Sequence, residues 1–182
     1  WRVARYIAEG ASAKVFELEA TDPVTDPARA RRALKVFEGD LAGGQAEARK
    51  VWRAFRHEVR ALHRAQGHAG VLEMCGAHVL DTQTGPLPCI LTRHLPESLW
   101  TGAMRLSPAR GCREGHGRPR VDEGAAAKYI YDLLGVMEFL HETKLIAHRD
   151  IKMDNLMLTE DNQVVVVDFG LASDARAEGG PP

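Results

Sequence analysis

Cysteine is scarce in this sequence, and the few cysteines form no recognisable pattern. The 182 residues include 3 cysteines, Cys75, Cys89 and Cys112, with no C-x-x-C pair among them. A disulfide framework or a structural zinc site is therefore not expected. No apolar run approaches the roughly 18 residues of a membrane-spanning helix, and nothing near Trp1 resembles a signal peptide. We expect no membrane span and a cytoplasmic location, with the nucleus as the alternative.

The sequence also lacks an excess of charge of either sign. It has 24 Lys and Arg against 25 Asp and Glu, a formal net charge of -1. Proteins that bind nucleic acid neutralise phosphates with surplus Lys and Arg, so nucleic-acid binding is not expected. With 45% apolar and 27% charged residues, the composition is that of an ordinary globular chain with one domain or two small lobes.

The first half of the sequence predicts five strands and one helix. Alternating apolar and polar residues, bounded by turn signals, indicate strands at residues 2–7, 15–20, 33–37, 71–75 and 88–92. Over residues 45–66 the apolar side chains recur at helical spacing, and Gly67 is a plausible helix end.

The second half predicts an inserted loop, a helix and a hairpin. Residues 101–121 are rich in Gly, Pro and Arg and are interpreted as a loop. Asp122 is a candidate N-cap for a helix with an apolar face. Strands are predicted at 156–158 and 164–167, with a turn over 159–162 between them. The apolar residues of the predicted helix are Ile130, Leu133, Leu134, Met137 and Leu140.

Two short motifs carry the chemistry. Residues 148–155 read His-Arg-Asp-Ile-Lys-Met-Asp-Asn, and residues 168–170 read Asp-Phe-Gly after a run of four valines. Phosphoryl transfer needs a carboxylate near the accepting hydroxyl and oxygen ligands for magnesium on the phosphates. The predicted hairpin folds the second motif back toward the first. Both motifs resemble those of the protein kinase family, with Ile151 where the family pattern has Leu.

The resemblance implies a role for each residue of these motifs, with ATP and Mg²⁺ as the cofactors and a protein as the substrate. Asp150 is then the catalytic base, and Asn155 and Asp168 are the metal ligands. Lys152 lies beside the transferred phosphate, and a lysine at this position marks serine/threonine kinases. Together with Leu62, the motif residues His148 and Phe169 resemble members of the hydrophobic stack of an active kinase.

A lysine and a glutamate upstream fit the same family. Ala33-Leu34-Lys35 resembles the family's strand motif, so Lys35 is the candidate for holding the α- and β-phosphates of ATP. Glu58 lies on the predicted helix on the same side as the apolar residues, where it could form an ion pair with Lys35. Taken alone, either residue would be read as a solvated surface charge.

The remaining nucleotide-binding residues are placed by the same resemblance. Val15 and Ala33 are expected above the adenine base and Leu156 below it. Thr92 corresponds to the gatekeeper, and residues 93–95 to the hinge. The hinge residues are Arg93, His94, interpreted as a surface histidine, and Leu95.

The phosphate-covering loop is the weakest match. The family pattern G-x-G-x-x-G-x-V lies over residues 8–15, where Ala8 and Ala13 replace two glycines and only Gly10 remains. Alanine adds a methyl group and restricts positive φ, which would affect the approach of the backbone to phosphate. The loop faintly resembles that of Numb-associated kinases.

The predicted fold class is α+β, a truncated protein-kinase-like fold. A five-stranded antiparallel sheet with one helix forms an N-lobe over residues 1–92, a hinge follows at 93–95, and a mainly helical C-lobe begins within 96–182. We expect the chain to stop before the family's Ala-Pro-Glu motif and its second long helix to expose apolar surface.

Three functions remain open at this point. The leading one is a protein serine/threonine kinase, the activity residing in the parent protein more than in this segment. The altered glycine loop keeps open a catalytically weak or inactive nucleotide-binding pseudokinase that acts as a scaffold. A small-molecule phosphotransferase shares the strand lysine and metal ligands, but Lys152 and Asp-Phe-Gly argue against it.

Overall fold

The chain folds into two compact units in a computed structural model. The structure describes residues 1–10, 13–22, 30–39, 44–83, 85–106 and 122–175. Unit 1 comprises residues 1–66, 72–94 and 169–172, and unit 2 comprises residues 67–71, 95–168 and 173–182. Each unit is described by itself below.

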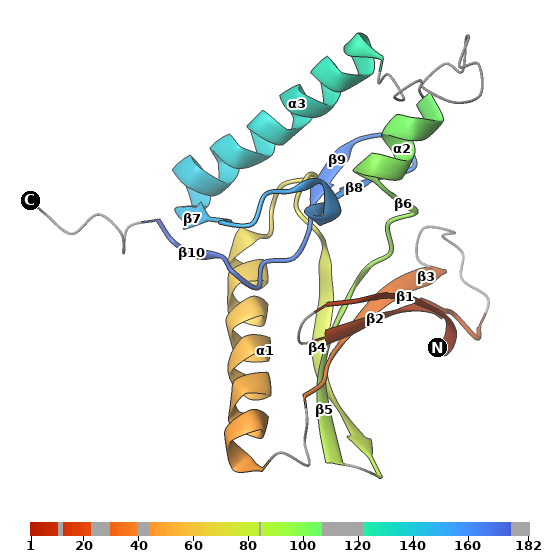
Figure 1. The fold of residues 1–182 in the computed structure, drawn as a ribbon, viewed down its shortest axis with the longest axis vertical. Helices are drawn as coiled ribbons and strands as arrows, with labels where there is room; N and C mark the ends of the chain where they lie inside the picture. Colours follow the sequence, from red (N-terminus) through yellow and green to blue (C-terminus); the bar gives the residue numbers. More distant parts are fainter. Residues whose placement is uncertain (11–12, 23–29, 40–43, 84, 107–121, 176–182) are drawn as a thin grey trace, which may run out of the picture. The chain divides into compact units, whose positions relative to one another are not determined.

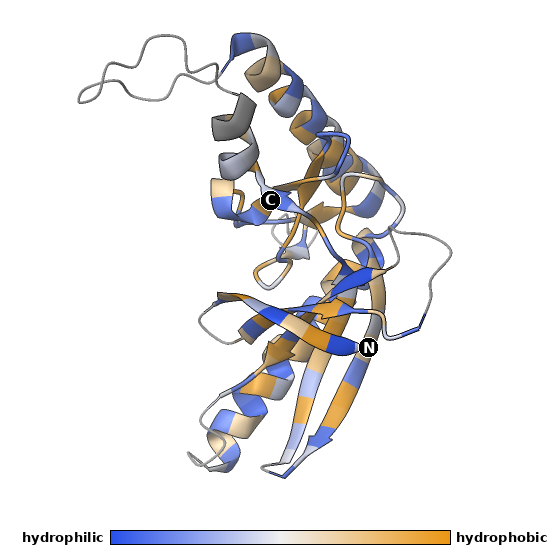
Figure 2. Ribbon diagram, turned by 90° about the vertical axis from the view of Figure 1, so that its right-hand side faces the viewer, coloured by the Kyte–Doolittle hydropathy of each residue, from blue (hydrophilic) through white to orange (hydrophobic). Residues whose placement is uncertain are grey.

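Unit 1 contains a five-stranded antiparallel sheet, as predicted (Figure 1). The strand order across the sheet is β1-β2-β3-β5-β4, and every neighbouring pair is antiparallel. Hydrophobic and hydrophilic residues are interspersed along these strands (Figure 2). The strands are β1 (Arg2–Glu9), β2 (Ala13–Glu19), β3 (Arg31–Phe37), β4 (Met74–Thr82) and β5 (Gly85–Arg93).

The fourth strand differs from the prediction, which placed it at residues 71–75. Strand β4 runs from Met74 to Thr82 at the edge of the sheet, and Val79 and Leu80 on it are 47% and 40% exposed. A strand that exposes both faces needs no apolar alternation, because the backbone ladder with β5 holds it. The sequence pattern therefore could not mark its course.

Helix α1 (Gln45–Ala65) covers the sheet of unit 1 and confirms the predicted helix. Its buried residues include Val51, Phe55 and Leu62. The ring of Phe55 meets the ring of Phe37 from β3 edge-on, with 5.6 Å between centroids. The helix ends at Gln66, whose side-chain amide donates to the carbonyls of Leu62 and Leu72, at 3.0 and 2.9 Å. This amide joins the end of α1 to the chain that leads into β4.

Helix α3 (Glu123–Glu138) is the main helix of unit 2, and it begins where the sequence predicts. The side chain of Asp122 accepts a hydrogen bond from the backbone N–H of Ala125 at 2.9 Å, which caps the first turn. A π-helical segment, Phe139–Lys144, continues the helix. Ile130 and Leu134, both on the predicted apolar face, are 59% and 61% exposed. Unit 2 therefore covers only part of that face.

Helix α2 (Leu99–Leu106) corrects the prediction of a loop over residues 101–121. Its first turn is capped by Ser98, whose hydroxyl accepts from the backbone N–H of Thr101 at 3.2 Å. The Gly, Pro and Arg residues on which the loop prediction rested are concentrated after Leu106, whereas the preceding turns are more apolar. Residues 107–121 lie outside the part of the chain that the structure describes.

Short strands complete unit 2. The predicted hairpin is present as β8 and β9, and β6 pairs with β8 at its side. A bridge between Val71 and Val166, with Val166 N–H donating to the carbonyl of Gly70 at 2.8 Å, ties residues 67–71 to β9. No helix among the described residues is long and apolar enough to cross a membrane. The strands are β6 (Glu97–Ser98), β7 (Ile146–Ala147), β8 (Leu156–Leu158), β9 (Val164–Val166) and β10 (Ser173–Asp174).

Candidate active site

A buried histidine organises the loop between β7 and β8. His148 is 1% exposed, and its Nε2 lies 3.0 Å from the carbonyl oxygen of Val167. Its Nδ1 accepts a hydrogen bond from the backbone N–H of Asp150 at 3.3 Å. Because Nδ1 accepts, the proton of the neutral ring belongs on Nε2, where it is donated to Val167. Burial lowers the pKa of His148, which favours this neutral form. His148 therefore positions two backbone segments and is not placed as a base.

The carboxylate of Asp150 is held by two neighbours from its own loop. Its Oδ2 accepts from Lys152 Nζ at 2.9 Å and from Asn155 Nδ2 at 2.7 Å. Hydrogen bonding from Lys152, assisted by Asn155, lowers the pKa of Asp150, and the same bond raises the pKa of Lys152. Both side chains are thus charged near neutral pH. A fixed, ionised carboxylate with an ammonium beside it can accept a hydrogen bond from a hydroxyl group and balance nearby negative charge.

The structure also brings Asn155 and the residue before Asp168 together. The backbone N–H of Val167 donates to the carbonyl of Asn155 at 3.0 Å, so Asp168 follows directly from a residue bonded to Asn155. Asp168 has a φ of 60° and Arg149 a φ of 65°, both in the left-handed region. Residues other than glycine adopt this region at a cost, and such strain clusters at functional sites. Four described residues other than glycine have a positive φ, and two of them, Arg149 and Asp168, belong to the two motifs.

Asn155 and Asp168 fit a magnesium ion by the chemistry of their donors. The Asn155 amide nitrogen is engaged by both the backbone carbonyl and the carboxylate of Asp150, at 2.9 and 2.7 Å, and this orients the amide oxygen. Magnesium prefers oxygen ligands and is commonly held by one or two protein side chains together with substrate phosphates. An amide oxygen and a carboxylate on adjoining backbone segments meet that requirement.

In unit 1, Lys35 and Glu58 form an ion pair. Lys35 Nζ lies 2.7 Å from Glu58 Oε1 and 2.8 Å from Oε2. Strand β3 supplies the lysine and the buried face of α1 supplies the glutamate, which is 5% exposed. The Lys35 side chain retains 22% exposure. The arrangement leaves a partly accessible ammonium whose direction is set by a buried carboxylate.

The sheet register places three further predicted residues on the face that carries Lys35. Val15 is paired with Lys35, and Ala33, two residues before Lys35, is paired with Thr92. Directly paired residues of antiparallel strands point to the same face, as do residues two apart along one strand. Val15, Ala33 and Thr92 therefore surround Lys35 on the helix-covered side. The predicted partner Leu156 is 4% exposed on β8 in unit 2.

The predicted glycine loop shows no positional need for its one glycine. Gly10 N–H donates to the carbonyl of Ala13 at 2.8 Å, and among the described residues a Cβ at Gly10 would meet only that oxygen, at 3.7 Å. Ala8 is paired with Val15 and is exposed. Residues 11 and 12 lie outside the described residues.

A buried carboxylate near the hinge was missed from the sequence. Glu17 on β2 is 4% exposed and forms ion pairs with Arg5 and with Arg31, the latter at 3.4 Å. The bond from Arg5 lowers the pKa of Glu17. His94 Nε2 lies 3.7 Å from Glu17 Oε2, and its side chain is only 9% exposed, so the interpretation of His94 as a surface histidine was wrong. The sequence did contain a signal for this burial. Glu17 lies two residues after Val15 on the same strand, so both side chains point to the same face of the sheet.

The other hinge residues are also tied into the chain. Arg93 N–H donates to the carbonyl of Glu73 at 3.0 Å, and Leu95 is 7% exposed. The expected stack residues Leu62, His148 and Phe169 are each 1% exposed or less.

A comparison with family profiles matches residues 1–180 to the protein kinase domain. The chain belongs to the protein kinase family. The hormonally up-regulated neu tumor-associated kinase of Mus musculus is 43% identical over 62 residues, which are 34% of this chain and 8% of that protein. CBL-interacting protein kinase 22 of Oryza sativa subsp. japonica is 29% identical over 184 residues, which cover 98% of this chain and 37% of that protein.

The chain therefore spans well under half the length of these curated relatives. Within this kinase domain, hydrogen bonds join side chains of the 148–155 motif to one another. His148 and Asn155 are also bonded to the backbone of Val167, the residue before the Asp-Phe-Gly motif.

Proposed function

We propose that this kinase domain transfers the γ-phosphate of ATP to a serine or threonine hydroxyl of a protein substrate. The observation that carries the proposal is the Asp150 carboxylate, bonded at once by Lys152 and Asn155. Lys152 is also the residue that favours serine and threonine over tyrosine as acceptors. The family match supports ATP as the phosphate donor.

The catalytic loop supplies the groups that act on the accepting hydroxyl. Asp150 accepts the hydroxyl proton and orients its oxygen toward phosphorus, while Lys152 balances charge on the transferred group. Asn155 and Asp168 would hold Mg²⁺, which when bound neutralises charge on the phosphates. Their positions follow from the bonds of Asn155 to Asp150 and of Val167 to Asn155.

Unit 1 supplies the groups that hold the nucleotide. Lys35, directed by Glu58, binds the α- and β-phosphates. The hinge, residues 93–95, is proposed to bind the adenine edge. The residues proposed to surround the rest of the nucleotide are Ala8, Gly10, Val15, Ala33, Thr92 and Leu156.

The compartment proposed is intracellular and cytoplasmic. A kinase needs ATP, and the sequence has only 3 cysteines, with no C-x-x-C pair among them. A sequence with few, unpatterned cysteines is in keeping with a reducing compartment.

Phosphate transfer by the full-length protein tests the proposal. With radiolabelled ATP and a generic protein substrate, we expect Asp150→Asn to lower the rate by about 10²-fold or more, the usual contribution of a general base. Asp154→Asn is the matched control, because Asp154 is exposed on the same loop. Equal rates for the wild type and Asp150→Asn would sink the proposal.

The second candidate is a nucleotide-binding pseudokinase that acts as a scaffold. Alanines replace two glycines of the phosphate-covering loop, and Gly10 has no backbone requirement for glycine. For this candidate we expect a thermal shift with Mg²⁺ and ATP but no phosphate transfer from the full-length protein. Turnover that depends on Asp150 would exclude it.

A further inference from the structure

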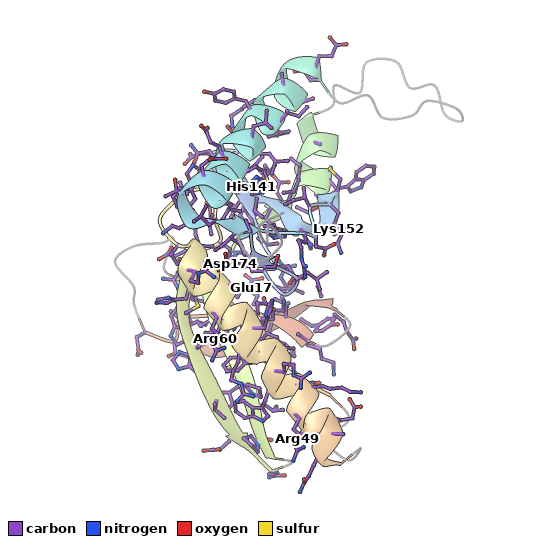
Figure 3. All side chains as sticks on the ribbon, turned by 90° about the vertical axis from the view of Figure 1, so that its left-hand side faces the viewer. Glu17, Arg49, Arg60, His141, Lys152 and Asp174 are labelled. Atoms are coloured by element: carbon purple, nitrogen blue, oxygen red, sulfur yellow. The ribbon has the colours of Figure 1, made fainter. Side chains whose placement is uncertain are left out.

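Four arginines form a single row along the exposed side of α1. Arg49, Arg53, Arg56 and Arg60 are spaced by four, three and four residues, and all four are exposed. At 3.6 residues per turn this spacing keeps them on one side of the helix, opposite its buried residues. We call this row the arginine stripe. Figure 3 shows two of its members, Arg49 and Arg60, on α1.

The charges of the arginine stripe are not balanced within the described chain. None of the four arginines forms an ion pair with another described residue. The two acidic residues of α1 are engaged elsewhere, Glu47 with Lys50 and Glu58 with Lys35. Like charges three or four residues apart destabilise a helix. The stripe therefore costs stability, and the described residues of unit 1 give it no ion-pair partner.

A hollow lies beside the N-terminal half of the stripe. It is shallow and largely open to solvent, and its lining includes Gln45, Ala48, Arg49, Trp52 and Arg56. The indole of Trp52 packs edge-on against Phe55, with 5.8 Å between ring centroids, which fixes it as an apolar wall. Two arginines of the stripe, Arg49 and Arg56, are among the residues that line this hollow. An apolar side chain next to a carboxylate is the kind of pair that such a surface accepts.

We propose that the arginine stripe docks an acidic helical segment of a protein partner, with one apolar side chain of that segment in the Trp52 hollow. Carboxylates at the same four-three-four spacing on a helix lying alongside would meet the guanidinium groups one by one, because both helices rise about 1.5 Å per residue. The stripe is about 16 Å long, or roughly three helical turns.

Charge and exposure favour a protein over the other polyanions. The chain as a whole has a net charge of -1, without the surplus of basic residues that binding to nucleic acid draws on. A helix that binds a membrane surface needs exposed apolar side chains beside its basic ones. Trp52, the apolar side chain next to the stripe, is half-buried. The inference goes beyond the proposed function and does not depend on phosphate transfer.

Fluorescence anisotropy with the full-length protein and no nucleotide tests the docking surface. The probe is a labelled 16-residue helical peptide with Glu at the matched spacing and one Leu, and a second peptide has the same composition in scrambled order. Arg53→Gln with Arg56→Gln removes two stripe charges and keeps a good helix former. The control, Lys14→Gln with Lys50→Gln, removes the same charge from residues paired with Glu38 and Glu47.

We expect the matched peptide to bind and the stripe variant to bind it about five- to tenfold more weakly, while the control variant stays within about twofold. Circular dichroism of both variants checks that they are folded. No binding by the wild type, equal losses in both variants, or equal binding of the scrambled peptide would each overturn the proposal. Tighter binding of RNA or of anionic vesicles through the same arginines would overturn it too.

Discussion

The carboxylate of Glu58 is buried on α1, where an isolated charge would be costly, and Lys35 supplies its partner at 2.7 and 2.8 Å. Removing one member of such a pair destabilises a protein more than the pair itself stabilises it, because the other charge loses its compensation. The same geometry directs the ammonium of Lys35. At this residue, stability and the proposed function therefore depend on one contact.

For Glu58→Gln we expect phosphate transfer to fall by about tenfold or more and the free energy of unfolding to fall by about 1–3 kcal/mol. Glutamine keeps the size and one oxygen but removes the charge that orients Lys35. Chemical denaturation and a radiolabelled phosphate assay measure the two effects. Glu47→Gln is the control, since its pair with Lys50 is exposed and worth about 0–1 kcal/mol. Identical behaviour of the two variants would contradict the role given to Glu58.

The neutral form of His148 predicts a pH dependence of stability. Burial lowers its pKa in the folded protein, so below about pH 6.5 the unfolded chain binds a proton that the folded chain resists. The contribution of His148 to stability is therefore full above that pH and is lost as the pH falls through it. Melting temperatures between pH 8 and 5.5 measure this loss.

His148→Gln should flatten that pH profile, although the variant is less stable at every pH because it loses the bonds to Val167 and Asp150. His141, an exposed histidine (Figure 3), is the control, and His141→Gln should leave the profile unchanged. If His141→Gln flattens the pH dependence of the melting temperature instead, the dependence comes from an exposed histidine and not from His148.

Packing of α2 against β8 is the decisive contact at the scale of elements. Gly102 on α2 lies so close to β8 that a Cβ there would stand 2.2 Å from Leu158 Cδ1. Leu158 is fully buried, so it has little room to move. This close approach holds α2 against β8, whereas most of the Gly, Pro and Arg residues that suggested a loop lie after Leu106.

Gly102→Ala is expected to destabilise the protein by about 1–3 kcal/mol, the usual cost of overpacking. Gly135→Ala on α3 is the matched control, because its Cβ would meet nothing within 4 Å. There the better helix propensity of alanine should stabilise by up to about 1 kcal/mol. Thermal unfolding followed by circular dichroism gives both values. A stabilising Gly102→Ala would show that α2 does not pack on β8 as described.

The proposed site residues are divided between the two units of the molecule. Lys35 and Glu58 belong to unit 1, and Asp150, Asn155 and Asp168 belong to unit 2. Each set is organised within its own unit, by the ion pair in the first and by the hydrogen bonds within residues 148–155 in the second. Substitutions in either set are therefore expected to weaken nucleotide binding.

ATP with Mg²⁺ should raise the melting temperature of the full-length protein, by mass action on the folded state. At 100 times the dissociation constant the stabilisation is about 2.7 kcal/mol. Chelation of Mg²⁺ should remove most of the shift, and Asp168→Asn should remove the part that depends on Mg²⁺. Lys35→Met should reduce the shift with or without the metal. A shift that survives chelation and both substitutions would contradict the proposed nucleotide site.

Some elements could be predicted because their signals are local. Helix α1 and strand β8 follow from apolar spacing over a few turns or residues, and the cap of α3 follows from Asp122. Strand β4 was displaced in the prediction, since an exposed edge strand is held by its neighbour's backbone. Helix α2 was missed for a different reason: its last residues were grouped with the Gly-, Pro- and Arg-rich residues that follow Leu106.

The sequence by itself determined the family and the order of the chemical groups, because the residues of 148–155 act within one loop and a short hairpin returns Asp168 to it. Only the tertiary structure decided which distant charges meet. The pair of Lys35 with Glu58, the burial of Glu17 beside His94 and the exposure of the arginine stripe all depend on strand register and helix packing. These contacts join residues that are far apart in the sequence and are brought together when the chain buries its apolar side chains. A local sequence pattern therefore does not predict them.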